Sequence, residues 1–284
     1  MTLDGQDLDR AFGRAVLQGN LEEARRLLDR GAKPAPDEIM GPCETLNVEG
    51  LKFLVESGVP FQDEHGDKMA PVGLLLEGYY RNPEKKHACL AYCEEIGVDF
   101  PYTPVMVMHR GRIDLLKKHL ARDPNLPHRR FSHRDIYPRE LGCHEDESLA
   151  LHGAPLAGTT LLHMCMDFDE ADIARWLVEK GADVNARAAI DANGFGGHTP
   201  LFNIVVSQAC RSGRQRDGAL ARLLLEKGAD PNAVASIRKG IRFIEDETVH
   251  EYRNVTPLQF ARAFRHRAWV SEPAMKLIEE SGGR

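Results

Sequence analysis

Apolar and polar positions follow one another along this chain with the period of an amphipathic helix, and the same pattern recurs in seven segments. Counted back from the turn residue that closes each segment, apolar side chains mostly occupy the fourth and seventh positions. Residues with this spacing share one face of a helix, so each segment predicts a helix with a single buried stripe. The segments are residues 21–32, 48–59, 87–98, 113–124, 171–182, 218–229 and 272–283.

Each of these segments closes on a residue that stops a helix. The fourth segment ends at Asp123, where Pro124 prevents the helix from continuing. The other segments end on a glycine, for which a left-handed backbone conformation carries no Cβ penalty. These glycines are Gly31, Gly58, Gly97, Gly181, Gly228 and Gly282.

A shorter helix is predicted ahead of the longer one, and its start carries a recurring motif. "GTTLLHMC" at 158, "GHTPLFNI" at 197 and "NVTPLQFA" at 254 share a threonine and, two positions later, a leucine. Threonine suits a helix N-cap, and proline suits the first turn, where its missing N–H leaves no bond unmade. Cys165 occupies the position of Ile204 and Ala261, so the motif predicts a packed corner and not a chemical site.

At these helix pairs the sequence resembles the ankyrin repeat family. The resemblance rests on "LVEKGADVN" and "LLLEKGADPN", on the "GHTPL" and "NVTPL" that precede such helix ends, and on "AVLQGNLEEARRLLDRGA". Residues 1–33 and 158–284 match closely, and residues 36–126 match only through the second-helix stripe and its cap. The resemblance implies an all-α solenoid of about seven helix-turn-helix units with β-turn fingers. It also implies protein recognition through the fingers and the concave first-helix face, and a structural role for His163.

The repeat spacing departs from the family period of about 33 residues. Early caps lie close together, and later ones are separated by insertions that all fall on the finger side. We therefore expect about four divergent repeats in residues 1–126, an inserted loop at 127–157, and about three repeats in 158–284. The last part carries finger insertions at 186–198 and 233–255. All of these repeats are expected to form one continuous solenoid.

The insertion "VASIRKGIRFIEDETVHEYRN" predicts a β-hairpin. Its β-branched and aromatic residues alternate with charged residues on both sides of a turn signal. Arg238, Arg242, Phe243 and Tyr252 would then be partly exposed, and arginine with aromatics is typical of binding hot spots. The alternative is that the aromatic and isoleucine side chains only pack the hairpin onto its neighbour.

The 127–157 insertion is the richest in polar side chains. The candidate partner-binding residues of this insertion are His128, Arg129, Arg130, Phe131 and His133. Phe195 is a further candidate, in the insertion at 186–198. Zinc is an alternative, because imidazole and thiolate are its preferred ligands. The spacing of the histidines and cysteines in this insertion forms no paired zinc knuckle, so we expect no metal ligands and a solvated recognition loop.

Composition and charge exclude several classes of protein. With 284 residues, 42% of them hydrophobic, the chain can bury a core, and a net charge of −6 argues against a general nucleic-acid binder. No apolar run reaches the length of a membrane span, and the start lacks a signal peptide, so a cytoplasmic location is expected. The six scattered cysteines are expected to be reduced.

The sequence therefore predicts a non-enzymatic scaffold with no catalytic residues and no cofactor, whose partner is a protein. The G-x-S-x-G, H-E-x-x-H and phosphate-loop motifs are absent from it. Binding to a membrane or to nucleic acid is not expected. Two alternatives stay open: a metal- or small-molecule-binding activity in the His-rich insertion, and a self-associating structural protein that exposes Trp269 and Ile278. The second alternative includes a homo-oligomer.

Overall fold

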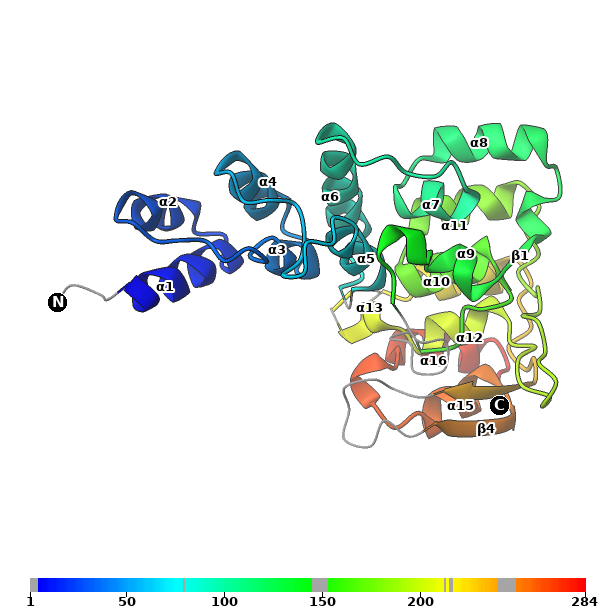
Figure 1. Cartoon of the computed structure of the whole chain (residues 1–284). Coiled ribbons are helices and arrows are strands. Elements are labelled where there is room, and N and C mark those ends of the chain that lie inside the picture. Colours follow the sequence, from blue (N-terminus) through cyan, green and yellow to red (C-terminus); the bar gives the residue numbers. More distant parts are fainter. Residues whose placement is uncertain (1–4, 79, 145–152, 212, 215–216, 240–248) are drawn as a thin grey trace. The chain divides into compact units, whose positions relative to one another are not determined.

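The computed structural model describes residues 5–78, 80–144, 153–211, 213–214, 217–239 and 249–284. Over these ranges helices dominate, and they follow one another in pairs (Figure 1). The first helices of the pairs are α1 (Gly5–Leu17), α3 (Met40–Glu44), α5 (Ala70–Glu77), α7 (Pro104–His109), α10 (Leu161–Phe168), α12 (Pro200–Val205) and α15 (Pro257–Ala263). The second helices are α2 (Leu21–Asp29), α4 (Val48–Glu56), α6 (Pro83–Glu95), α8 (Ile113–Arg122), α11 (Ala171–Glu179), α14 (Ala219–Glu226) and α16 (Glu272–Glu280).

Shorter elements lie between these pairs and, in the last two pairs, between the two helices of a pair. Two antiparallel pairs of strands occur in the described residues, β1 with β2 and β3 with β4. The strands are β1 (Arg130–Phe131), β2 (Thr159–Thr160), β3 (Ala235–Lys239) and β4 (His250–Val255). The remaining short helices are η1 (Leu126–His128), α9 (His133–Ile136), η2 (Arg139–Leu141), α13 (Gln208–Arg211) and η3 (Arg267–Trp269). The pairing of β3 with β4 confirms the predicted hairpin, with a register irregularity between Ala235 and Ile237.

Helix ends form where the sequence predicts them. Thr256 caps α15 by accepting a hydrogen bond from the backbone N–H of Gln259 at 3.2 Å, and the Gln259 side chain accepts one from the Thr256 N–H in return. The glycine after each of the six glycine-capped second helices adopts a positive φ, between 86° and 97°. These capped ends determine where each helix pair ends and its finger begins.

The helical stripe predicted from the sequence forms the core. Of the side chains four and seven positions before the closing residue, all are buried except His119, which is partly buried and stacks on Tyr102 with ring centroids 4.1 Å apart. The buried members are Ala24, Leu27, Leu51, Leu54, Leu90, Cys93, Leu116, Ala174, Leu177, Ala221, Leu224, Met275 and Ile278. Each second helix therefore stabilises its unit through one apolar face, at roughly 1.5–3 kcal/mol for each large aliphatic side chain that is buried.

The chain divides into two compact units. The first comprises residues 1–80, 84–100 and 137–144, and the second comprises 81–83, 101–136 and 145–284. This division differs from the boundaries at 126 and 157 that repeat spacing suggests. The reason is that residues 137–144, within the predicted inserted loop, pack with the first unit.

In the first unit, α1 packs on α2 and α3, and α3 packs on α4 and α5. Helix η2 covers α5, and the two backbones approach closely at Gly73 and Gly142. A Cβ atom at Gly73 would overlap the Gly142 carbonyl, so only glycine allows this contact. The return of the chain at 137–144 is therefore a packed part of the first unit.

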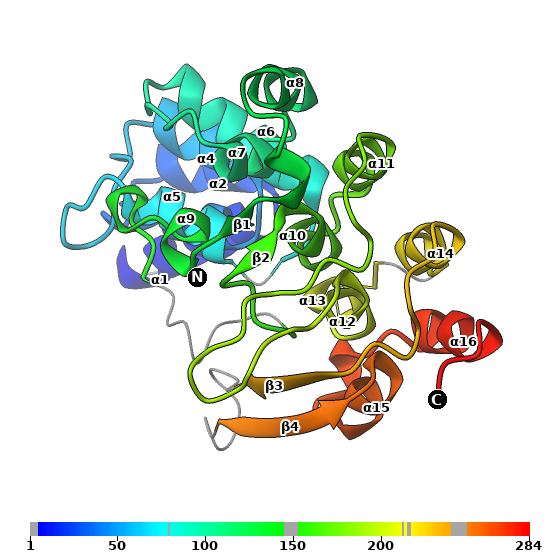
Figure 2. The ribbon, with the colours of Figure 1, turned by 90° about the vertical axis from the view of Figure 1, so that its right-hand side faces the viewer.

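In the second unit, first helices and second helices form two adjacent rows. Figure 2 shows α10, α12 and α15 in one row and α11, α14 and α16 in the other, with the hairpin β3–β4 beside α15. Asparagine side chains at the start of the fingers form hydrogen bonds between successive helix pairs. The Asn185 side chain donates to the Gly228 carbonyl at 2.9 Å and accepts from the Asp230 N–H at 2.7 Å. Asn232 makes the same pair of bonds to Gly282 and Arg284.

A buried ion pair lies inside the second unit. Arg81 donates from Nε to Asp167 Oδ2 at 3.2 Å, and its Nη2 lies 3.1 Å from the same oxygen. Both side chains are almost fully buried, at 2% and 0% exposed. The Arg81 guanidinium also lies over the ring of Phe168, 4.5 Å from its centroid. The charge of buried Lys239 on β3 acts on the same carboxylate.

Candidate functional site

Hydrogen bonds between backbones join the three finger segments of the second unit. The Gly158 N–H donates to the Phe131 carbonyl at 2.7 Å, and the Ala189 N–H donates to the Gly158 carbonyl at 2.8 Å. The Gly196 N–H then donates to the Ser236 carbonyl at 2.6 Å, which reaches β3. We call residues 130–134, 155–160, 186–198 and 235–239 the finger platform.

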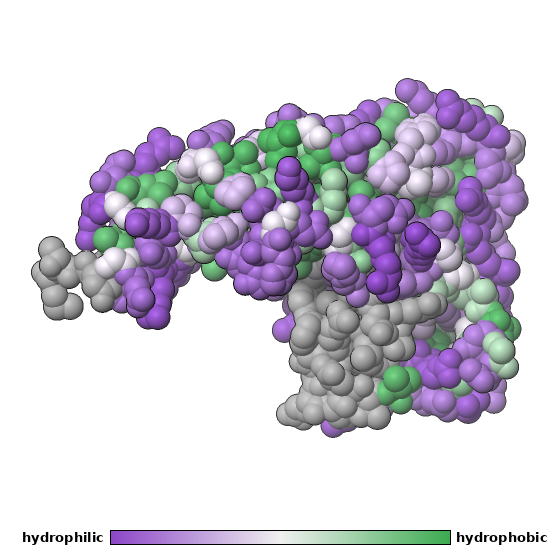
Figure 3. All heavy atoms as spheres, in the orientation of Figure 1, coloured by the Kyte–Doolittle hydropathy of each residue, from purple (hydrophilic) through white to green (hydrophobic). Residues whose placement is uncertain are grey.

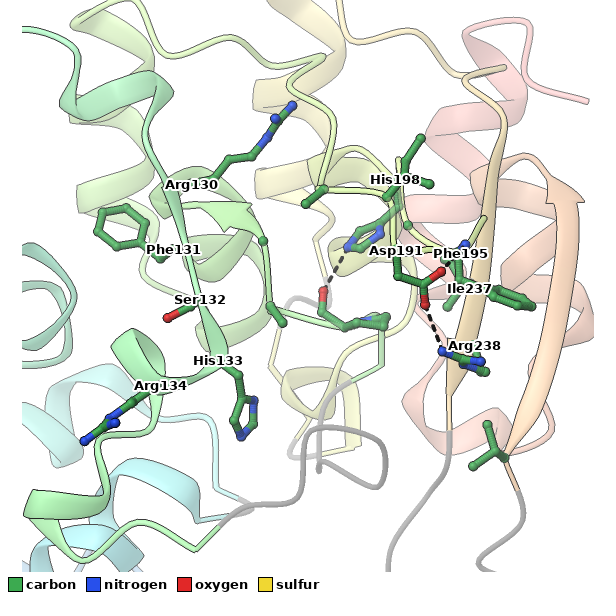
Figure 4. A pocket seen from close by; sticks show the side chains of 17 residues that line it. Arg130, Phe131, Ser132, His133, Arg134, Asp191, Phe195, His198, Ile237 and Arg238 are labelled. Atoms are coloured by element: carbon green, nitrogen blue, oxygen red, sulfur yellow. Dashed lines mark hydrogen bonds and ion pairs between the residues drawn. The ribbon is translucent and has the colours of Figure 1, made fainter. Parts of the chain in front are cut away.

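The finger platform surrounds a cavity of about 850 Å³. One wall comes from β1 and the start of α9, and the opposite wall comes from the second finger and β3 (Figure 4). Val249, the residue before β4, adds an exposed aliphatic side chain. The lining residues are Arg130, Phe131, Ser132, His133, Arg134, Pro155, Ala157, Gly158, Ala189, Ile190, Asp191, Phe195, Gly196, His198, Ile237, Arg238 and Val249.

Asp191 shapes the second finger. Its Oδ1 accepts hydrogen bonds from the N–H groups of Asn193 at 2.8 Å and Phe195 at 2.9 Å, and its Oδ2 accepts one from Arg238 at 2.8 Å. The hydrogen bond from the Phe195 N–H is the largest cause that lowers the pKa of this carboxyl group. Gly196 has a φ of 122° and packs against the Ala189 carbonyl, where a Cβ would overlap it. The finger is therefore held in one conformation by side-chain and backbone contacts.

We expect Asp191→Ala to release this finger, because the Phe195 amide and the Arg238 guanidinium both lose their acceptor. The rate of amide hydrogen exchange at residues 191–196 should rise by about tenfold, which is the effect of losing roughly 1.4 kcal/mol of local stability. Asp172→Ala is the matched control, since Asp172 pairs with Arg175 on the surface of α11. Unchanged exchange in the Asp191 variant would contradict this role.

Phe195 contacts two guanidinium groups. Arg238 is 4.8 Å and Arg253 is 4.3 Å from the centroid of its ring. On the opposite wall, Arg130 Nε donates to the Arg187 carbonyl at 2.9 Å. No carboxylate of the described residues lies within ion-pair distance of Arg130 or Arg134. The positive charge of this wall is thus not neutralised by those residues.

Two buried histidines lie at and behind the cavity floor. His198 Nε2 donates to the Pro155 carbonyl at 2.8 Å, and His163 Nε2 donates to the His198 carbonyl at 3.1 Å. Nδ1 of His163 accepts hydrogen bonds from the N–H and the hydroxyl of Thr160, the N-cap residue of α10. Burial lowers the pKa of His163 to about 3 and that of His198 to about 4. Both rings are committed to structural bonds in their neutral form, which agrees with the structural role expected for His163.

The structure brings five of the predicted partner-binding residues together around the cavity: Arg130, Phe131, His133, Phe195 and Arg238. His128 is exposed outside its lining, and Arg129 borders a second hollow of about 290 Å³ on the other side of Phe131. Arg242 and Phe243 lie outside the described residues.

Tyr252 departs from the expectation that it is partly exposed. It is 9% exposed and packs edge-on against Phe260, with centroids 5.0 Å apart. The reason is that Tyr252 pairs with buried Ile237 across the hairpin, on the face that contacts α15. Of the residues missed by sequence reasoning, Asp191 had a usable signal in the glycine-rich turn "DANGFGG" that it organises.

The C-terminal residues expected to be exposed are also buried. Trp269 is 2% exposed and stacks on Phe264 with ring centroids 6.1 Å apart, and Ile278 is fully buried. The expectation of an exposed apolar end at these two residues is therefore wrong. Helix η3 folds Trp269 inward because the Ser207 N–H donates to its carbonyl at 2.9 Å.

The His-rich insertion is distributed over both units. His128 and His133 belong to the second unit, whereas Cys143 and His144 belong to the first, where Cys143 is buried. His152 lies outside the described residues. Among the residues that the structure describes, no group of three or more histidine, cysteine or acidic side chains could hold a metal ion.

The thiols are not arranged for chemistry. All six cysteines are free, and each is buried apart from Cys210, which is partly exposed. Burial raises the pKa of Cys89 and Cys93 to about 12 and that of Cys210 to about 11. Because the thiolate is the reactive form, these groups are inert near neutral pH. No helix in the described part of the chain has both the length and the apolar character of a membrane span.

The chain is built of repeated helix pairs with finger segments. Comparison with known protein families identifies the type of repeat. A sequence model of the ankyrin repeat family matches residues 157–189, which include β2, α10 and α11. The chain therefore contains an ankyrin repeat and is an ankyrin repeat protein. No curated protein matches the sequence.

Two solved ankyrin repeat domains illustrate the similarity. One is from Acinetobacter baumannii; it is 17% identical, with a TM-score of 0.34 over 96% of this chain and 98% of that one. The other is the ankyrin repeat domain of human ASB11; it is 16% identical, with a TM-score of 0.37 and the same coverage of both chains.

Proposed function

We propose that this chain is a non-enzymatic recognition protein that binds a partner protein at the cavity of its finger platform. Ankyrin repeats generally mediate protein–protein interaction. The observation that carries the proposal is that three insertions, far apart in the sequence, converge on one cavity of about 850 Å³. Insertions that only lengthened connections would have no reason to meet.

Rigidity of the platform supports a binding role. The backbone bonds from Phe131 through Gly158 and Ala189 to Ser236 fix the two walls before a partner arrives. A preformed site loses less conformational freedom on binding, so more of the contact energy appears as affinity. Exposed Ile190, at 67%, and Val249, at 41%, offer apolar area beside arginine side chains, which is typical of protein interfaces.

The surface of the second unit differs between the platform and the outer helices. Figure 3 shows mainly hydrophilic residues over α8, at the upper right, and hydrophobic residues at the right-hand edge below it, over the finger segments. Lys117 and Lys118 on α8 are exposed, and only Leu116 of this helix is buried. The outer face of α8 therefore serves as an internal control surface.

Site-specific photocrosslinking tests the proposal. A benzophenone amino acid replaces Ile190 on the platform in one variant and Lys118 on α8 in another, and both are irradiated in lysate of the native source. We expect a defined protein adduct from position 190 and none of comparable yield from position 118. Adducts from position 118 alone, or none from position 190, would count against the finger platform as the binding site.

A further inference from the structure

We infer that the partner presents to this cavity an extended segment in which carboxylates flank an aliphatic side chain. This inference rests on the proposed function and specifies the chemistry of the partner. It starts from the order of charged and apolar groups around the cavity.

Positive charge lies at the rim of the cavity. In Figure 4, Arg130 and Arg134 extend from opposite ends of one wall; Arg134 points away from the other wall, and the His133 ring lies beside it. Both arginines are exposed. Asp191 is the acidic member of the described lining, and its charge is neutralised by Arg238 at 2.8 Å. The described lining is therefore positive, in a chain whose net charge is −6.

Apolar groups occupy the space between these charges. Partly exposed Pro155 and Ala157 line the interior, and Ile190 and Val249 stand exposed at the far wall. An aliphatic side chain that enters here would bury its surface against these groups, at about 25 cal/mol per Å². A carboxylate in the same place would lose its hydration without gaining an ion pair. The interior therefore favours an apolar group of the ligand, and the rim favours its acidic groups.

An extended segment fits this arrangement because its side chains alternate between opposite faces. One face can direct an aliphatic side chain between the walls, while neighbouring carboxylates reach Arg130 and Arg134 at the rim. Arg130 and Arg134 carry planar forks of N–H donors that match a carboxylate. The overall negative charge of the chain opposes acidic ligands elsewhere on its surface, so this local positive wall supplies selectivity.

Fluorescence anisotropy with short labelled peptides tests the inference. The probe has the central sequence Asp-Glu-Leu-Glu-Asp between Gly-Ser flanks. One control replaces the acids by lysine and arginine, and a second replaces leucine by serine. We expect the full-length protein to bind the acidic leucine peptide at least about tenfold more tightly than either control, and binding to weaken when the ionic strength rises from about 0.05 M to about 0.5 M.

Matched variants locate the binding. Arg134→Glu alone, and Arg130→Glu with Arg134→Glu, should weaken binding by about tenfold or more, because each converts attraction into repulsion. Ile190→Ser should weaken it without changing the salt dependence. Lys117→Glu with Lys118→Glu changes the net charge as much as the double arginine variant does, but on α8, and should leave binding close to the parent value.

The helical circular dichroism of each variant checks that it folds, and Arg134→Glu covers the case in which loss of the Arg130 bond to Arg187 disturbs the platform. Equal binding of the acidic and basic peptides, equal weakening by the α8 variant, or no binding of the acidic peptide would overturn the inference. Crosslinking from position 190 that persists beside such a result would leave the recognition function standing and reject only the acidic chemistry. Failure of that crosslinking would reject the function itself.

Discussion

Replacing Arg81 by methionine should lower the free energy of unfolding of the second unit by about 3–5 kcal/mol, the range observed when one partner of a buried ion pair is removed. The variant leaves the Asp167 carboxylate, which is fully buried, without its guanidinium. It also removes the cation that lies 4.5 Å from the centroid of the Phe168 ring. The remaining charge of Lys239 offsets only part of the loss, because it is a single buried ammonium.

Urea denaturation followed by circular dichroism measures this effect, and an exposed pair supplies the control. Arg262 and Glu279 are 2.6 Å apart but about half exposed, so Arg262→Met should cost less than about 1 kcal/mol. The double variant Arg81→Met with Asp167→Leu should recover part of the stability, because the Asp167 carboxylate is then no longer buried without its guanidinium. A loss for Arg81→Met no larger than that for Arg262→Met would show that the buried pair contributes little.

Acidification from pH 7 to pH 5 should lower the free energy of unfolding by about 3–4 kcal/mol through His163 and His198 together, at 1.36 kcal/mol for each pKa unit of difference between the two states. Their pKa values in the folded protein are about 3 and about 4, whereas an unfolded histidine has a pKa of about 6.5. Below pH 6.5 the unfolded chain therefore binds protons that the folded chain excludes. Stability is present above that pH and is lost progressively as the pH falls toward 4.

Geometry explains why the folded protein resists these protons. A proton on Nδ1 of His163 would face the Thr160 N–H, which now donates to that nitrogen. Thermal or urea unfolding between pH 5 and pH 7 gives the slope, and His163→Gln with His198→Gln should reduce it even if the variant is less stable. His128→Gln, at an exposed position of the same unit, is the control and should retain the parent slope. A parent slope that survives the double substitution would reject this account.

Local patterns allowed much of the fold to be predicted. The second helices and their glycine ends follow from spacing within a dozen residues, and the hairpin follows from alternation within 233–255. The face of the hairpin did not follow, because Tyr252 can be assigned to solvent or core only if the position of Phe260 on α15 is known. Trp269 escaped prediction for the same reason, since Phe264 and the backbone of Ser207 decide its burial.

The candidate site depends on contacts that local patterns do not encode. The sequence indicated that insertions share the finger side and named Arg130, His133, Phe195 and Arg238 separately. Their meeting around one cavity requires the stacking of α10, α12 and α15, which brings residues more than one hundred positions apart together. The pairing of Arg81 with Asp167 likewise joins a connection before α6 to the last turn of α10, and neither residue lies in a recognisable motif.

The return of residues 137–144 to the first unit has a consequence for synthesis of the protein. Helix α5 obtains its cover at Gly73 only when η2 and Gly142 have been made, after all of α7 and α8. At roughly 5–20 residues per second, the ribosome adds the intervening residues 101–136 in a few seconds. For that time the N-terminal repeats carry an uncovered helix while the next unit is already emerging, so their completion waits on a segment translated later.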